Sequence, residues 1–138
     1  MGTRGTMRRL LALGMAGWLV GAAVGCGTDG EERDARHAAE KLYTAVADKH
    51  GGAACATLTP AAAHALEEQE GEACARAVTS VQLSGSRASR VRVYETSAAV
   101  SFEGGETAFL DHTDEGWRAS AAGCRPMGQE RADCELED

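Results

Sequence analysis

The chemistry that this sequence offers lies mainly in its five cysteines, whose positions divide them into two kinds. Cys26 follows an apolar run directly, behind the small residue Gly25. The other four lie in the more polar remainder of the chain: Cys55, Cys74, Cys124 and Cys134. A thiol directly behind a signal-peptide cleavage point can carry a lipid, whereas an even set of thiols in an exported chain forms disulfides. Both uses depend on export, which the first residues of the chain indicate.

Residues 1–25 have the three parts of a secretory signal peptide. Arg4, Arg8 and Arg9 form a basic head without an acidic residue, residues 10–24 are apolar, and residues 29–34 behind them are mostly charged. A permanent membrane span is the alternative. However, 15 residues cover about 22 Å as a helix, whereas the bilayer core needs about 30 Å. The Arg8-Arg9 pair leaves open whether export follows the general or the twin-arginine route.

The tetrad Ala23-Val24-Gly25-Cys26 resembles the bacterial lipobox, with Ala23 where leucine is usual. The resemblance implies that the Cys26 thiol receives a diacylglyceryl group and becomes the new N-terminus. Acyl chains in this number anchor a protein stably to a membrane. We therefore expect an exported protein held by its lipid on the outer face of the cell membrane. Ordinary cleavage, with Cys26 as a free thiol of a soluble product, is the alternative outcome.

Removal of residues 1–25 leaves 113 residues, enough for one small domain. The chain has 14 basic and 21 acidic residues, and the removed segment contains three of the basic residues and no acidic one. The mature net charge is therefore −10. Such an acidic domain is not expected to bind nucleic acid or to adhere electrostatically to anionic lipid headgroups.

The four remaining cysteines permit three disulfide pairings. We prefer Cys55–Cys74 and Cys124–Cys134, because the partners of each pair lie near each other in sequence. Closing loops of this size stabilises a domain by about 3 kcal/mol each. Zinc binding is the competing interpretation, but the chain has no C-x2-C pair and its histidines are scattered. We expect no metal and no other cofactor.

Helices are predicted within residues 35–82. Residues 27–34 form a polar segment, so residues 26–34 are expected to be a lipidated N-terminus and tether. A helical stripe begins at Ala35 and ends before Gly51-Gly52. Thr59-Pro60 is typical of a helix start, and Gly71 of a helix end. The predicted fold class is α+β, with N-terminal helices packed on a curved antiparallel sheet of about four strands, in a domain of residues 35–126.

The sheet is predicted within residues 90–122, where apolar and polar residues alternate. In residues 90–95 Val91 and Val93 share one face, opposite Arg90, Arg92 and Tyr94.

A two-residue Gly104-Gly105 hairpin loop and a three-residue loop at residues 114–116 set the predicted register of the next strands. This register pairs Val100 with Phe109 and places Leu110 on the opposite face. The predicted core face holds the scarce large side chains: Val100, Phe102, Phe109, Trp117 and Ala119. Residues 127–138 are expected to be an acidic surface tail held by Cys134.

Several motifs taken together resemble a group of small exported actinobacterial lipoproteins. These motifs are Cys55-Ala56-Thr57-Leu58-Thr59-Pro60, Cys74-Ala75, Phe109-Leu110, Gly116-Trp117-Arg118 and Ala122-Gly123-Cys124-Arg125-Pro126. The group is largely uncharacterised, so the resemblance implies a location and a fold but no activity. Its layout is similar to NTF2-like or cystatin-like folds. In NTF2-like proteins the helices and a curved sheet enclose a pocket, which serves binding in some members and catalysis in a few.

Residues able to perform acid–base chemistry are few and spread out. Asp111 and His112 are strand neighbours and should point to opposite faces, with His112 in solvent, away from Trp117. A flexible loop is expected at Ser84-Gly85-Ser86. The three other histidines have no ligand-like spacing: His37, His50 and His64.

An NTF2-like enzyme, or a binder of a small apolar ligand, is the alternative hypothesis. It would use Asp111 as base and Tyr43 as hydrogen-bond donor, although Tyr43 is better explained as a packing residue. The favoured hypothesis is a non-enzymatic domain with no catalytic residue, which binds an envelope protein or a small molecule.

Overall fold

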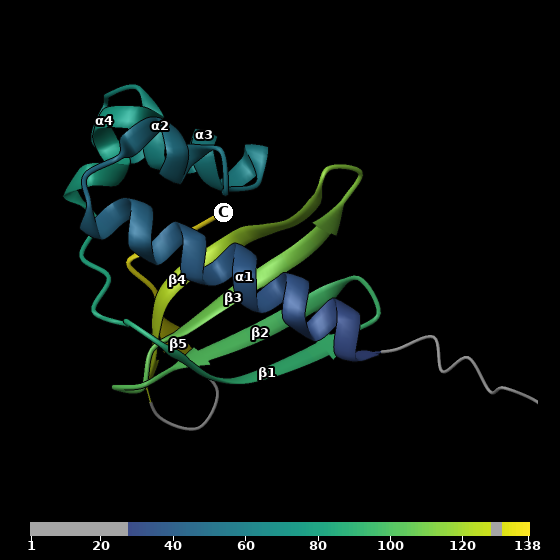
Figure 1. Cartoon of the computed structure of the whole chain (residues 1–138). Coiled ribbons are helices and arrows are strands. Elements are labelled where there is room, and N and C mark those ends of the chain that lie inside the picture. The colour runs from purple at the N-terminus through teal and green to yellow at the C-terminus, as the bar shows by residue number, and fades with distance from the viewer. Residues whose placement is uncertain (1–27, 128–130) are drawn as a thin grey trace, which may run out of the picture.

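The computed structural model describes residues 28–127 and 131–138 as an α+β fold, with a helical N-terminal part followed by an antiparallel sheet (Figure 1). The helices are α1 (Thr28–Ala47), α2 (Gly51–Cys55), α3 (Pro60–Glu70), α4 (Cys74–Ala77) and the 3-10 turn η1 (Val78–Ser80). The strands are β1 (Ala88–Tyr94), β2 (Ser97–Phe102), β3 (Thr107–Thr113), β4 (Gly116–Met127), β5 (Arg131–Asp133) and β6 (Leu136–Glu137). The predicted signal peptide and Cys26 lie outside the described residues.

The strand order is β1-β2-β3-β4-β5, and β6 pairs with β4. The predicted fold class is thus confirmed, but four strands is an undercount. Both extra strands lie in the segment that was expected to be a surface tail, and Leu136 of β6 is buried. The apolar side chain of Leu136 and the free edge of β4 explain why this acidic segment does not remain a tail.

Helix α1 begins at Thr28. Residues 28–34 are therefore helical, and the prediction that they form a tether is wrong. Asp29 and Glu31 lie in the first turn, where the helix dipole favours negative charge. The Glu31 carboxylate also accepts a hydrogen bond of 3.0 Å from Nε1 of Trp117 on β4. A contact between residues 86 positions apart therefore holds a turn that has little apolar periodicity of its own.

Helix α3 forms where its local signals place it. Thr59 is the N-cap, and its hydroxyl accepts the Ala62 N–H at 3.1 Å. Pro60 takes the first helical position, and Gly71 ends the helix in the left-handed conformation at φ 66°. These are the usual devices for a helix start and a helix end.

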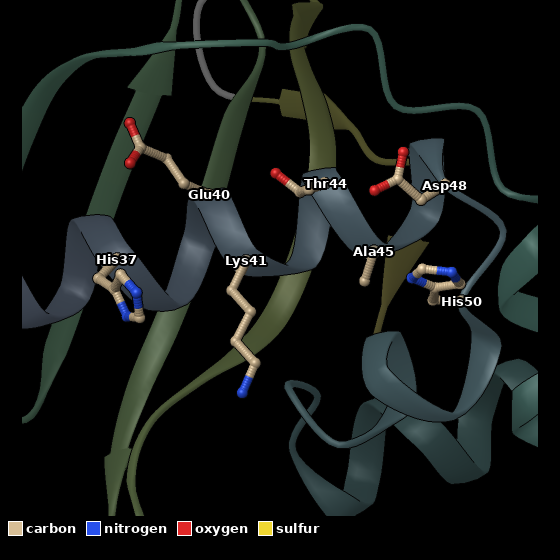
Figure 2. A pocket seen from close by; sticks show the side chains of 7 residues that line it. All are labelled: His37, Glu40, Lys41, Thr44, Ala45, Asp48 and His50. Atoms are coloured by element: carbon tan, nitrogen blue, oxygen red, sulfur yellow. The ribbon is translucent and has the colours of Figure 1, made fainter.

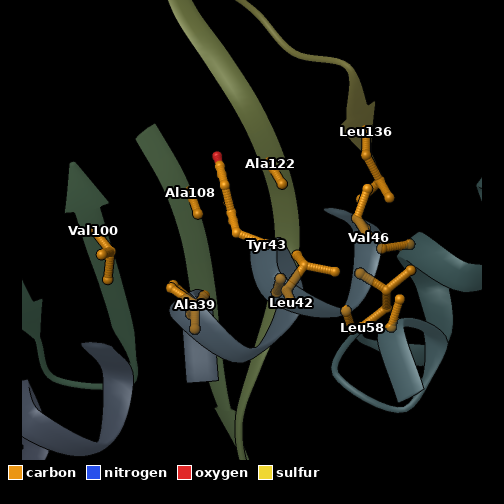
Figure 3. Close-up of a cluster of buried hydrophobic side chains, with 14 of the residues drawn as sticks. Ala39, Leu42, Tyr43, Val46, Leu58, Val100, Ala108, Ala122 and Leu136 are labelled. Atoms are coloured by element: carbon orange, nitrogen blue, oxygen red, sulfur yellow. The ribbon is translucent and has the colours of Figure 1, made fainter. Parts of the chain in front are cut away.

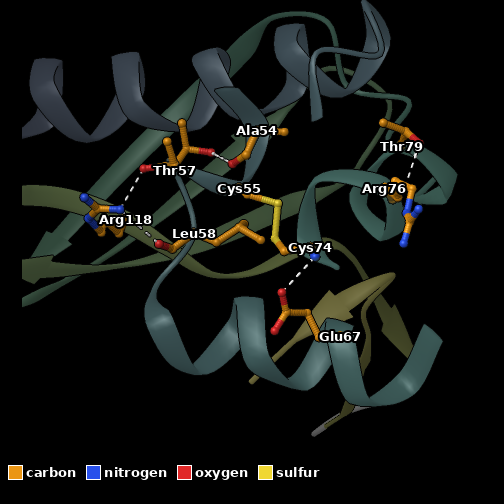
Figure 4. Close-up of a disulfide and its surroundings, with 10 residues drawn as sticks. Ala54, Cys55, Thr57, Leu58, Glu67, Cys74, Arg76, Thr79 and Arg118 are labelled. Carbon is orange, nitrogen blue, oxygen red and sulfur yellow. Dashed lines mark hydrogen bonds between the residues drawn. A yellow bond between two sulfur atoms is a disulfide. The ribbon is translucent and has the colours of Figure 1, made fainter. Parts of the chain in front are cut away.

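Both predicted disulfides are present in the structure. Cys55–Cys74 joins α2 to the start of α4, where the Glu67 carboxylate also accepts the Cys74 N–H at 2.8 Å (Figure 4). Cys124–Cys134 joins β4 to the segment that precedes β6. The first disulfide thus connects the short helices to one another, and the second holds the C-terminal strands to the sheet.

The core lies between α1 and the sheet (Figure 3). Ala39 and Leu42 of α1 are fully buried, as are Val100 and Ala108 of the sheet. The small alanine side chains allow the helix to approach the strands closely. Tyr43 stacks on Phe102, with ring centroids 3.9 Å apart, as expected of a packing residue.

The predicted register of the β2–β3 hairpin is wrong by one residue. Val100 pairs with Ala108, not with Phe109, and the loop between Phe102 and Glu106 has three residues. Both loop glycines, Gly104 and Gly105, adopt positive φ values of 98° and 93°. Because side chains alternate along a strand, this slip exchanges the two faces of β3. Phe109 is 41% exposed on the outer face, and Leu110 is fully buried in the core.

The loop between β3 and β4 is one residue shorter than predicted. Thr113 pairs with Gly116, so the loop contains two residues, Asp114 and Glu115. Trp117 pairs with His112 on the helix-covered face, and Ala119 pairs with Leu110. The predicted core positions of Trp117 and Ala119 are therefore confirmed, but their neighbours are not those expected.

Candidate functional site

Asp111 and Tyr43 do not form an acid–base site. Asp111 lies on the outer face of β3, in register with Arg118 of β4, so its predicted position on the face of Trp117 is wrong. Tyr43 points into the core, where its hydroxyl accepts the Gly123 N–H at 3.1 Å. Burial raises the pKa of the Tyr43 phenol above its ordinary value. The sheet separates the two groups, so neither can assist the other in proton transfer.

His112 pairs with Trp117, so its predicted position on the opposite face is wrong, although its side chain is exposed to solvent as predicted. The two rings meet edge to face with centroids 5.0 Å apart. Nε2 of His112 lies 3.9 Å from the Glu31 carboxylate, the same group that Trp117 binds. This cluster connects the first turns of α1 to the sheet. That structural role is sufficient to explain why Glu31, His112 and Trp117 lie together.

A groove of about 340 Å3, lined mostly by polar residues, runs along α1 (Figure 2). His37 and His50 lie at its two ends, with Lys41 between them. Glu40 is engaged elsewhere, because its carboxylate accepts the Ala88 N–H at 3.2 Å. His64 faces Glu68 on α3 at 3.5 Å, and both side chains are exposed. Within residues 28–127 and 131–138, no three histidine, cysteine, aspartate or glutamate side chains are grouped to hold a metal ion.

The most deeply buried acid in the described chain is Glu106, which is 1% exposed and was not singled out from the sequence. Its carboxylate accepts the backbone N–H groups of Ser84 at 3.1 Å and Gly85 at 3.3 Å. It also accepts hydrogen bonds from the Ser84 hydroxyl and the Arg125 guanidinium. Burial alone would raise the pKa of the Glu106 carboxyl, but these donors together hold that pKa below its ordinary value.

The loop expected at Ser84-Gly85-Ser86 is present, but it is held by hydrogen bonds to Glu106 and is not the unconstrained segment that was predicted. A side chain at Gly85 would come within 2.8 Å of both Phe102 and Tyr43, so this loop packs directly on the aromatic pair. A glutamate at the start of a strand is ordinarily a surface residue, and no local signal distinguishes Glu106 from one. All close partners of the Glu106 carboxylate donate hydrogen bonds to it, so this carboxylate serves to hold the loop and β4 in place.

The uncovered face of the sheet carries a groove whose side chains are suited to binding an anionic ligand. About 370 Å3 in volume, it is lined by three residues of β1 and four of β2 and β3: Arg90, Arg92, Tyr94, Ala99, Ser101, Thr107 and Phe109. Tyr94 is 56% exposed and Phe109 41% exposed. We name this surface the open face. The prediction that Arg90, Arg92 and Tyr94 share one side of their strand is confirmed.

The two arginines of the open face are not neutralised by the described chain. Among the described residues, neither Arg90 nor Arg92 forms an ion pair with a carboxylate. In contrast, Arg118 and Arg125 each contact a glutamate. The open face therefore presents two free guanidinium groups beside two exposed aromatic rings. This combination suits an anionic ligand with apolar parts.

No helix in the described ranges has the length and apolar character needed to cross a bilayer. The resemblance to exported lipoproteins and to NTF2-like or cystatin-like folds stays a prediction. Comparison of this chain with protein families, curated protein sequences and solved structures finds no match.

Proposed function

We propose that this chain is an exported lipoprotein whose domain is a non-enzymatic binding module for an anionic partner. The observation that carries the proposal is the free Arg90–Arg92 pair on the open face of an otherwise acidic domain. The alternative enzyme hypothesis has less support, because its base Asp111 and its donor Tyr43 lie on different sides of the sheet.

The chemistry of the open face supports an anionic partner. Alternate residues on a strand lie about 6.6 Å apart, so Arg90 and Arg92 can bind two successive anionic groups of an extended ligand. A guanidinium group binds a carboxylate or phosphate through two parallel hydrogen bonds. Tyr94 and Phe109 add exposed apolar surface beside these charges. Since the domain is acidic elsewhere, an anionic partner would be directed toward this face.

Export is supported by the two disulfides, which are compatible with a location outside the cytoplasm. Lipidation is supported by the sequence around Cys26. Because α1 is described from Thr28, only two residue steps separate it from a lipid on Cys26, and two residues span at most about 7 Å. The proposed anchor therefore holds the domain close to the membrane surface, without the longer tether that the sequence suggested.

Lipidation is tested by the intact mass of the protein after expression in a bacterium that has lipoprotein-processing enzymes. We expect a chain that starts at Cys26 and carries the mass of its acyl groups. Cys26→Ser is the matched control, and it should remain unlipidated. Recovery of an uncleaved wild-type chain, or of a chain cleaved elsewhere and free of lipid, would contradict the proposed anchor.

Anion binding is tested with polyglutamate and polyphosphate as probes, measured by calorimetry at low salt. Arg90→Glu/Arg92→Glu should weaken binding of at least one probe by about tenfold or more, because it reverses both free charges. Arg33→Glu/Arg76→Glu makes the same change of net charge at exposed helical positions, and it should alter affinity by less than about twofold. Equal losses in both variants would show that binding follows net charge only, and would refute a site on the open face.

A further inference from the structure

Strand β1 is the free edge of the sheet. Among the described strands it pairs only with β2, at the end of the order β1-β2-β3-β4-β5. One end of this edge is closed by α1, because Arg36 donates to the Ala88 carbonyl at 2.6 Å and Glu40 accepts the Ala88 N–H. Beyond that point, alternate residues of an antiparallel edge strand point their N–H and C=O groups away from the sheet. The pairing of β1 with β2 is irregular between Ala88 and Arg90 and regular from Arg90 onward, so the edge from Arg90 to Val93 can accept a further strand.

We infer that the anionic partner is an extended acidic polypeptide that adds as a strand to the free edge of β1. The inference rests on the proposed function and specifies the partner and its mode of binding. A strand added here would place alternate side chains beside Arg90 and Arg92 on the open face. Cross-strand neighbours have Cβ atoms about 4.5–5.5 Å apart, which is within reach of an arginine–carboxylate pair. Acidic residues at every second position would thus meet both guanidinium groups.

The same arginines select against a second copy of this chain. Antiparallel pairing of two β1 edges would bring arginines of both copies together, and like charges on neighbouring strands destabilise a sheet. Charged residues on edge strands commonly prevent such self-association. An acidic strand would instead be attracted. Arg90 and Arg92 would therefore favour acidic strands at this edge and disfavour a second copy of the chain. If the two arginines served only to prevent self-association, acidic peptides would not bind. A binding measurement with acidic peptides therefore distinguishes the two roles.

The edge also distinguishes a polypeptide from other anionic polymers. A polyphosphate or an acidic polysaccharide can contact Arg90 and Arg92, but it cannot complete the ladder of hydrogen bonds that the strand leaves unpaired. A polypeptide can satisfy both the guanidinium groups and the backbone groups. Binding through the edge is therefore expected to depend on the N–H groups of the ligand, whereas binding through charge alone is not.

The test uses an octapeptide of alternating threonine and glutamate, and the same peptide methylated on every backbone nitrogen. The wild-type domain should bind the first peptide about tenfold or more tightly than the second, because methylation removes the hydrogen-bond donors and leaves the carboxylates. Amide hydrogen exchange within Arg90–Val93 should slow on binding. Arg90→Glu/Arg92→Glu should lose this binding, whereas Arg33→Glu/Arg76→Glu should retain it.

The outcomes separate this inference from the proposed function. Equal affinity for the two peptides, or tighter binding of polyphosphate without slower exchange in β1, would overturn strand addition and leave an anion-binding open face in place. Binding of none of the peptides or polymers would refute both. Slower exchange in β1 together with loss of affinity on N-methylation would establish strand addition.

Discussion

Leu110→Ala is expected to lower the free energy of unfolding by about 2–5 kcal/mol, the usual effect of truncating a fully buried leucine. Leu110 is 0% exposed on the helix-covered face of β3, where it pairs with Ala98 and Ala119. These alanines cannot fill the space that the lost side chain would leave. Urea denaturation measures the effect, and Trp117 is a convenient fluorescent probe because the other tryptophan lies at residue 18, within the predicted signal peptide.

Phe109→Ala is the matched control, because Phe109 is the neighbouring residue on the same strand and is 41% exposed on the open face. We expect it to lower the free energy of unfolding by less than about 1 kcal/mol. The comparison tests the register directly, since a slip by one residue would exchange the two positions. A greater loss for Phe109→Ala than for Leu110→Ala would contradict the strand pairing of the β2–β3 hairpin.

Glu106→Gln is expected to lower the free energy of unfolding by about 3 kcal/mol at neutral pH. The substitution keeps the volume but replaces one acceptor oxygen with an amide donor, facing N–H groups of Ser84 and Gly85 and the Arg125 guanidinium. Hydrogen bonds to a charged group contribute about 1.5–3 kcal/mol, and a buried donor left without a partner costs about 1–3 kcal/mol. Glu103→Gln, at an exposed position of the same hairpin, should change stability by less than about 0.5 kcal/mol.

The stability that Glu106 contributes should disappear in acid. Its pKa is lower in the folded domain than its ordinary value of 4.5, so the folded state favours the charged form. The contribution is complete above pH 4.5 and is lost as the pH falls through the lower folded pKa. The difference in unfolding free energy between wild type and Glu106→Gln should therefore shrink below pH 4.5. A difference that stays constant through this range would show that the carboxylate charge is not what stabilises the loop.

Features that depend on near neighbours in the chain could be predicted from the sequence. The boundaries of α3 follow from Thr59, Pro60 and Gly71, each of which acts on backbone groups within four residues. The disulfide pairing followed from short separations of 19 and 10 residues, over which loop closure is easy. The open face was partly predictable too, because alternation along one strand is enough to place Arg90, Arg92 and Tyr94 together.

Features that depend on distant contacts could not be predicted in this way. The first turns of α1 carry few apolar residues, and their contact with the sheet runs through Glu31 and Trp117, 86 positions apart. Glu106 is buried because Ser84, Gly85 and Arg125 converge on it from two other segments. Nor does any local pattern show that residues 131–137 add two strands, since their pairing requires the edge of β4 to be free.

Register shows most clearly where local information ends. The alternating pattern of residues 107–113 indicates a strand with two different faces, but it does not say which face is buried. The lengths of the two loops decide that question, and loops of two and three residues are both acceptable locally. The choice between Phe109 and Leu110 is made by the space beneath α1, where Ala39 and Leu42 lie close to the sheet. Because that surface is formed by residues about 70 positions away, only packing in three dimensions could place Leu110 inside and leave Phe109 on the open face.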